Sequence, residues 1–156
     1  MLRRRRVKRT RGGGYRIDLP TEERELLRHL LPQLRELISV PPDDPQVRRL
    51  YPTAFPDDPE KEAEYRRFMH DELVASRQAA IDAVEASLDA KELDDAQANA
   101  WMTSLNSVRL VLGTMLDVSE DTDVALVSDD DPDVQAYALY AYLSLLLEEM
   151  LDAVSH

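Results

Sequence analysis

Residues 94–117 read DDAQANAWMTSLNSVRLVLGTMLD, and this stretch decides the predicted fold. Its apolar residues recur at the spacing of one helical face, and Leu110 and Val111 continue the apolar surface behind that face. The face itself consists of Ala98, Trp101, Leu105, Val108, Leu112 and Met115. A helix that is apolar nearly all round is normally surrounded by other elements. The sequence therefore predicts a central helix here.

Three further helices are expected to pack around this one. The first begins after Pro20, with Thr21 as its expected N-cap, and Pro32 should kink it. The other two begin at Asp58-Pro59 and Asp131-Pro132, because aspartate can cap free amides and proline suits the first helical position. The predicted fold class is all-α, a four-helix-type bundle formed by residues 21–156.

Residues 1–20 are predicted to form a β-hairpin or a basic arm packed on this helical domain. Apolar and polar residues alternate from Tyr15 to Leu19, and the three glycines at 12–14 can supply the positive φ angles of a turn. In a hairpin, Tyr15, Ile17 and Leu19 would face the body. A disordered basic tail with one short strand is the alternative. In both cases we expect the helices to bury their own apolar faces without this segment.

Charge is distributed very unevenly along the chain. It has 19 basic and 31 acidic residues, yet eight of the basic ones lie in the first 16 positions, where there is no acid. No Lys or Arg follows Arg109, which argues against the body as a nucleic-acid surface. The candidate nucleic-acid-binding residues are therefore Arg3, Arg4, Arg5, Arg6, Lys8, Arg9 and Arg11. Alternatively, this head offsets the negative charge of the body or docks on the acidic run 129–133.

The composition also excludes several kinds of site. With no cysteine, the chain can form no disulfide, thiolate metal site or nucleophilic thiol. No phosphate-binding loop, nucleophile elbow or metal-ligand spacing occurs, so we expect no cofactor and no metal. The most apolar window, 136–147, is too short to cross a bilayer, and no apolar segment follows the basic start. We therefore expect a cytoplasmic protein without a membrane contact.

His70, Asp71 and Glu72 are the residues most suited to acid–base or metal chemistry. Consecutive residues of a helix point in different directions, however, which favours a structural role. Arg109 flanks the apolar face of the central helix, and a salt bridge to Asp71 or Glu72 is its favoured role. A ligand-anchoring arginine is the alternative. A pocket of His70, Asp71 and Arg109 would make the chain a small enzyme or a ligand-binding protein.

The last predicted helix carries three tyrosines, Tyr137, Tyr140 and Tyr142. They exceed what one core face needs, and tyrosine is favoured at interfaces because its ring is apolar and its tip polar. They are candidate interface residues for a homodimer or a partner protein. A fully internal helix is the alternative.

Several segments together match a known family. Residues 8–20, KRTRGGGYRIDLP, lead into EERELL at 22–27. Further on are RRLYP at 48–52, EYRR at 64–67, HDEL at 70–73 and LNSVRLVLG at 105–113. With these segments, which span almost the whole chain, the protein resembles an actinobacterial family long catalogued as a domain of unknown function and now named for oxidative-stress transcriptional regulation.

The resemblance implies a non-enzymatic cytoplasmic regulator that acts through contacts with the transcription machinery, such as a sigma factor, or with promoter DNA. The family name also implies a redox input. Because this chain has no cysteine, it can contain no thiol–disulfide switch. Either a partner senses the stress, or stress sensing is absent in this member of the family. Oxidation of Met69, Met102, Met115 or Met150 is a weak remaining route.

Overall fold

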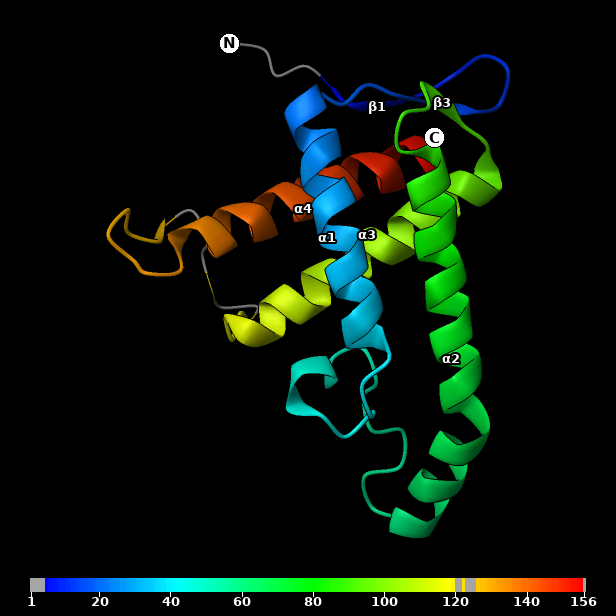
Figure 1. Cartoon of the computed structure of the whole chain (residues 1–156), viewed down its shortest axis with the longest axis vertical. Helices are drawn as coiled ribbons and strands as arrows, with labels where there is room; N and C mark the ends of the chain where they lie inside the picture. Colours follow the sequence, from blue (N-terminus) through cyan, green and yellow to red (C-terminus); the bar gives the residue numbers. More distant parts are fainter. Residues whose placement is uncertain (1–4, 120–121, 123–125, 156) are drawn as a thin grey trace.

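The computed structural model describes residues 5–119, 122 and 126–155. It contains four α-helices, one short 3-10 helix and a small three-stranded antiparallel sheet (Figure 1). In chain order the elements are β1 (Val7–Arg9), β2 (Tyr15–Ile17), α1 (Thr21–Ile38), η1 (Pro45–Val47), α2 (Pro59–Ser87), β3 (Glu92–Leu93), α3 (Asp95–Met115) and α4 (Val134–Ser155). The prediction of a mainly helical fold with an N-terminal hairpin is confirmed.

Side-chain capping marks the starts of α3 and α2, whereas α4 begins at Val134, two residues after the Asp131-Pro132 pair at which it was predicted to begin. In α3, Asp94 accepts the Gln97 amide while the Gln97 side chain accepts the Asp94 amide, which forms a capping box. In α2, Asp58 accepts the Lys61 amide ahead of Pro59, as the sequence indicated. The prediction for α1 was wrong, because Thr21 is already helical and Pro20 at the N-cap position makes no side-chain cap.

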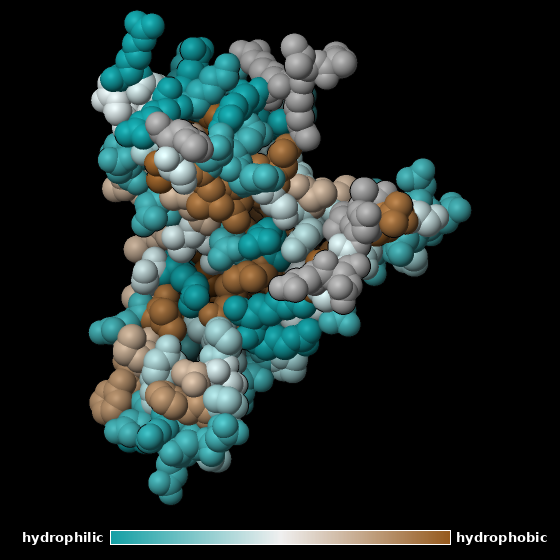
Figure 2. Space-filling model, turned by 180° about the vertical axis from the view of Figure 1, so that it is seen from behind, coloured by the Kyte–Doolittle hydropathy of each residue, from teal (hydrophilic) through white to brown (hydrophobic). Residues whose placement is uncertain are grey.

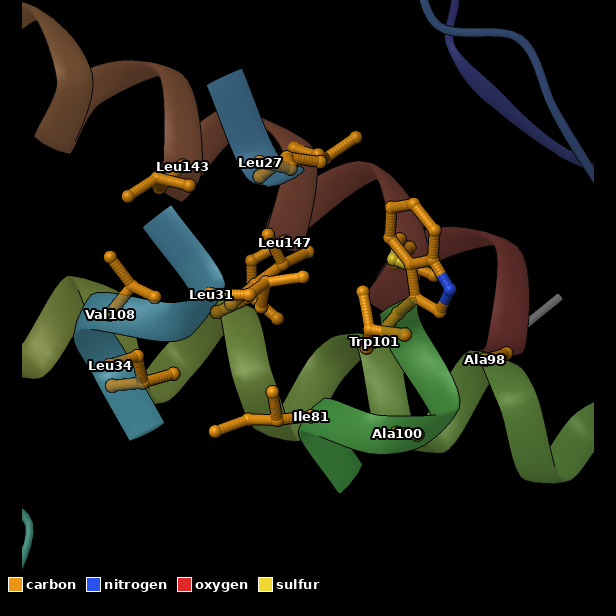
Figure 3. Packing of buried hydrophobic residues seen from close by; sticks show 14 of the residues in the cluster. Leu27, Leu31, Leu34, Ile81, Ala98, Ala100, Trp101, Val108, Leu143 and Leu147 are labelled. Carbon is orange, nitrogen blue, oxygen red and sulfur yellow. The ribbon is translucent and has the colours of Figure 1, made fainter. Parts of the chain in front are cut away.

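The core lies around α3, as the sequence predicted. Trp101 of α3 is fully buried, and Figure 3 shows it beside apolar side chains from all four helices. Its indole N–H donates to the Ser87 hydroxyl of α2 at 2.8 Å, so its polar atom is satisfied inside the core. Figure 1 shows α1 and α2 crossing α3 and α4, and α3 contacts α2 and α4 extensively. The central helix therefore connects the other layers.

The N-terminal hairpin pairs Val7 with Ile17 and Arg9 with Tyr15. Tyr15, Ile17 and Leu19 are buried, as predicted. Of the described glycines only Gly13 has a positive φ, +90°, so one position and not three requires glycine for this reason. A third strand, β3, pairs with β2 and was not predicted, because two residues carry too little pattern to read.

The hairpin is part of the core, which corrects the expectation that the helices bury their faces without it. Val7 is 0% exposed, and β1 packs directly on α4. In Figure 1 the hairpin lies across one end of the helices. Its removal would expose apolar side chains that the helices alone leave uncovered.

One half of α2 extends away from this core. Its buried residues after Glu62 are Ile81, Val84 and Ser87, all in its last two turns. In Figure 1 the first half of α2 extends below the end of α1, and it packs against the loop that precedes it. The helix is continuous through Ala75. We call residues 48–75 the α2 arm.

Candidate functional site

Two arginines of the basic head hold the hairpin to the helices. Arg6 donates two parallel hydrogen bonds to the Glu23 carboxylate, at 2.7 and 2.9 Å, and its backbone amide donates to Glu149 Oε1 at 2.7 Å. Arg5 forms an ion pair with Asp152 of α4. The hydrogen bond to Glu23 is the main reason that the pKa of Arg6 is raised. Arg5 and Arg6 therefore dock on these carboxylates and not on the run 129–133.

The remaining described cations of the head face outward. Lys8, Arg9 and Arg11 are exposed, and so is Arg16, which stands opposite Lys8 in the hairpin. None of the four side chains forms an ion pair with another described residue. Lys8 and Arg16 are like charges opposite each other, which repel, while Glu92 of β3 stands opposite Arg16 on its other side. The face is therefore mainly, but not wholly, positive. Arg3 and Arg4 lie outside the described residues.

The motif at 70–72 does not converge on one point. His70 is half-buried, whereas Asp71 and Glu72 are exposed. The ring of His70 meets the edge of Tyr51 at a centroid distance of 4.9 Å. His70 Nδ1 is buried and has no hydrogen-bond partner among the described residues. His70 therefore packs inside the α2 arm, while its two acidic neighbours face solvent.

A cavity of about 170 Å³ lies between α2 and the preceding loop, and His70 lines it together with Tyr51, Tyr65 and Arg77. The Arg77 guanidinium lies 4.8 Å from the centre of the Tyr51 ring and donates to the Leu50 carbonyl at 3.0 Å. The Tyr51 hydroxyl donates to the Ile38 carbonyl at 2.9 Å, and burial raises the pKa of Tyr51. These contacts attach the loop to the helix.

Glu62 provides a second attachment of this loop. Its carboxylate accepts the backbone amides of Ala54 and Phe55, at 2.8 and 3.0 Å, and the Arg66 guanidinium at 3.1 Å. The amide of Phe55 is the main cause that lowers the pKa of Glu62, and burial opposes it. The shape of the arm therefore depends on a charged carboxylate.

Arg109 has a different neighbourhood from the one predicted. It donates to Asn106 Oδ1 at 2.8 Å, one turn earlier on α3, and pairs with neither Asp71 nor Glu72. It lines an open groove between α2, α3 and α4, whereas His70 lines the cavity of the arm and Asp71 lines neither. Of the described residues that line the cavity and the groove, Arg77 alone lines both of them. The structure therefore does not bring His70, Asp71 and Arg109 into one pocket.

The three tyrosines of α4 are each partly buried against their own chain. The Tyr137 hydroxyl reaches the Leu116 carbonyl at 3.4 Å, and the Tyr140 ring lies beside Gly113 of α3. Tyr142 lies under the hairpin, with the Arg6 guanidinium 5.7 Å from its ring centre. Burial raises the pKa of Tyr142 strongly, and the nearby Glu23 carboxylate adds to this effect. Tyr142 is thus largely an internal residue.

The most exposed aromatic side chain of the described residues lies elsewhere, on the α2 arm. Phe68 is 65% exposed, and Met69 and Phe55 are 37% and 40% exposed. Phe55 meets Tyr65 edge-on at 6.0 Å. Figure 2 shows apolar residues among hydrophilic ones at the lower end of the molecule, where Figure 1 places the arm. We call Phe55, Tyr65, Phe68 and Met69 the arm patch.

Within the described residues, no group of three His, Asp or Glu side chains is arranged to hold a metal ion. None of the described helices is long and apolar enough to cross a membrane.

The chain is similar to a known protein family over nearly its whole length. The model of the domain of unknown function DUF2017 matches residues 4–154. The chain belongs to the DUF2017 family. The resemblance seen in the sequence is therefore confirmed.

Related proteins occur in mycobacteria. The oxidative stress regulators AosR of Mycobacterium bovis and Mycobacterium tuberculosis are each 28% identical over 127 residues, which is 70% of this chain and 58% of theirs. A Mycobacterium leprae relative is 28% identical over 130 residues, 72% of this chain and 59% of its own. The chain thus spans about three-fifths of these relatives. No solved structure is similar to it.

Sequence reasoning missed two features of this DUF2017 chain. Arg77 and Phe68 lie on α2 at positions that look like ordinary members of a long polar helix. The exposure of Phe68 could have been predicted. The residue follows Arg66-Arg67 on a helix with a weak apolar stripe, so few buried side chains are available for its ring to pack against. No comparable signal existed for Arg77, whose two neighbouring cavities are formed only by tertiary packing.

Proposed function

We propose that this chain is a non-enzymatic, cytoplasmic regulator of the oxidative-stress response that binds a protein of the transcription machinery, such as a sigma factor. The single observation that carries the proposal is the exposed arm patch, whose aromatic and methionine side chains the core does not bury. The names of the mycobacterial relatives support the regulatory role.

The arm has the composition of a protein-binding surface. Aromatic residues, Met and Arg are enriched at protein interfaces relative to the rest of the surface. The exposed Arg67 directly precedes Phe68 and Met69, and the exposed Asp71 lies two residues after Met69. The arm is also held in shape before binding, because Glu62 and Arg77 fasten the loop to α2. A preformed surface loses less entropy when a partner binds.

DNA is a second candidate partner, and the hairpin favours it. Lys8, Arg9, Arg11 and Arg16 are exposed and form no ion pair with described residues, in a chain with a net charge of −12. Such a face can neutralise phosphates without reading base sequence. The negative charge of the body opposes DNA binding. In this proposal DNA binding therefore adds to the contact with a protein partner and does not replace it.

The enzyme alternative receives less support. It requires His70, Asp71 and Arg109 to act on one substrate, and the two cavities that His70 and Arg109 line are different ones. A homodimer through the α4 tyrosines also receives less support, since Tyr142 is covered by the hairpin.

The test compares two variants with equally exposed apolar side chains. Phe68 and Met115 are 65% and 66% exposed, but Met115 lies at the end of α3, outside the arm patch. Phe68→Ser and Met115→Ser are introduced into a deletion strain, and transcripts are measured after peroxide treatment. In parallel, each tagged variant is purified from its native host and its bound proteins are identified by mass spectrometry.

We expect Phe68→Ser to lose both the transcriptional response and a transcription-machinery partner, and Met115→Ser to retain them. Both variants should unfold at the same urea concentration as the wild type, since neither side chain is buried. If Phe68→Ser restored the response fully, or if the wild type bound only metabolic enzymes, the proposal would be wrong.

A further inference from the structure

Two arginines differ from every other arginine in the described part of the chain. Only Arg77 and Arg109 contain a buried guanidinium nitrogen without a hydrogen-bond partner among the described residues, Nη1 in Arg77 and Nε in Arg109. Each makes one hydrogen bond, to the Leu50 carbonyl and to Asn106 respectively. Neither forms an ion pair with a described residue, although Arg5, Arg6, Arg28, Arg35, Arg48 and Arg66 all do.

Both arginines line the same groove. The groove encloses about 460 Å³ between α2, α3 and α4, which is within the common range for ligand sites, roughly 300–1,000 Å³. None of the described residues that line it is acidic, in a chain that contains 31 acidic residues. The groove is therefore a positive site on a protein whose net charge is −12.

The other lining residues divide into a polar and an apolar group. Asn99, Thr103 and Asn106 of α3 offer hydrogen-bonding side chains along one side. Leu147 and Leu151 of α4 line the apolar part, and Leu151 is 49% exposed. A guanidinium group recognises the oxygens of a carboxylate or phosphate through parallel N–H donors. The polar group, the two arginines and the leucines together suit a molecule with an anionic end and an apolar end.

We propose that this groove binds a small organic oxyanion, a carboxylate or a phosphate monoester, with its oxygens toward Arg77 and Arg109 and its apolar part on Leu147 and Leu151. This site goes beyond the proposed function and shares no residue with the arm patch or the exposed hairpin face. A ligand here would touch α2, α3 and α4 at once. It could therefore stabilise their packing without covering the partner surface.

The test uses benzoate, phenyl phosphate and inorganic phosphate as probes, with sodium chloride at matched ionic strength as the blank. Binding is followed by the NMR signals of the arginine Nε–Hε groups and by calorimetry. We expect saturable shifts at Arg77 and Arg109 with phenyl phosphate or benzoate, and weaker binding of inorganic phosphate, which has no apolar part. Shifts no larger than those in sodium chloride, or equal affinity for inorganic phosphate, would overturn the proposal.

Two pairs of variants locate the site. Arg109→Gln should weaken binding about tenfold or more, since it removes a charge-assisted hydrogen bond, whereas Arg67→Gln, on the exposed face of α2, should not. If Arg109→Gln fails to fold, Leu151→Asp places a carboxylate in the groove at a partly exposed position and should weaken binding similarly. Its control, Val154→Asp, changes an apolar residue of α4 that is 38% exposed and does not line the groove. Equal binding by both members of a pair would place the ligand elsewhere.

These outcomes are independent of the proposed function. Probe binding can succeed or fail whether or not Phe68 contacts a partner, because the two experiments use different variants and different ligands.

Discussion

Arg6 and Glu23 join the N-terminal strand to α1 through two parallel hydrogen bonds of 2.7 and 2.9 Å. Both side chains are less than one-fifth exposed. The Arg6 guanidinium also lies over the ring of Tyr142, so that one side chain contacts both α1 and α4. A residue from the basic head thus has a structural role.

Arg6→Ala should therefore destabilise the fold, by about 1–2 kcal/mol, because it breaks a charge-assisted bidentate pair that is only slightly exposed. Lys8→Ala, two residues away and exposed, should change the free energy of unfolding by less than about 0.5 kcal/mol. Urea unfolding measures both. Equal stability of the two variants would show that the pair contributes nothing.

Ser87→Ala should destabilise the core by about 1–3 kcal/mol, because the buried Trp101 N–H would lose its acceptor. Both residues are almost fully buried, at 0% and 1% exposure. Trp101 is the only tryptophan, so its fluorescence reports the transition directly. Ser155→Ala, which removes an exposed hydroxyl at the end of α4, is the control. No loss in Ser87→Ala would mean that the indole finds another acceptor.

Gly13→Ala should cost about 1–2 kcal/mol, since an L-residue with a side chain is strained at a φ of +90°. Gly12→Ala is the matched control, because an added Cβ meets nothing within 4 Å there and its φ is not positive. Thermal unfolding of both variants checks the difference. If both were equally stable, the turn would have adjusted its backbone.

Glu62 should make the stability of the α2 arm depend on pH. Its folded pKa lies below the ordinary value of 4.5, so the carboxylate stabilises the fold fully above that value and loses this effect as the pH falls through the folded pKa. Wild type should therefore exceed Glu62→Gln in stability near neutral pH, and the gap should close in acid.

Urea unfolding from about pH 7 to about pH 3 measures this gap. Glu64→Gln, which changes an exposed carboxylate on the same helix, should show no such dependence. A gap between wild type and Glu62→Gln that stayed constant across the range would contradict the assignment.

The hairpin face predicts a defined salt dependence for any DNA binding. If Lys8, Arg9, Arg11 and Arg16 all meet phosphates, they contribute a slope of log affinity against log salt of about −3.6, from roughly −0.9 for each phosphate. Changing Lys8 and Arg16 to Gln should halve this contribution. Lys61→Gln, on the α2 arm, should leave it unchanged. Binding that is unaltered in the double variant would move the site off the hairpin.

Substitution is a better test of this face than truncation. Removal of residues 1–11 would also remove Val7, which is buried in the core, and Arg5 and Arg6, which form ion pairs with the helices. If a truncated protein lost DNA binding, the cause could be the missing cations or a disturbed fold. Lys8 and Arg16 are exposed, so their substitution tests the cations alone.

The sequence by itself determined the helices and the inward face of the hairpin. Helical periodicity, the Asp58-Pro59 start and the alternation from Tyr15 to Leu19 are local patterns, and the forces behind them act between residues close in the chain. The central position of α3 followed from the same kind of pattern, because a helix that is apolar all round needs neighbours on every side. These predictions required no knowledge of which elements meet.

Only the tertiary structure decided which carboxylate each arginine meets. Arg6 pairs with Glu23, whereas Arg109 pairs with no acid among the described residues, although both arginines looked equally available in the sequence. Likewise, the exposure of Phe68 and the groove shared by Arg77 and Arg109 depend on how α2 crosses α3 and α4. Charge pairing and burial are set by distances between segments far apart in the chain, and no local pattern contains those distances.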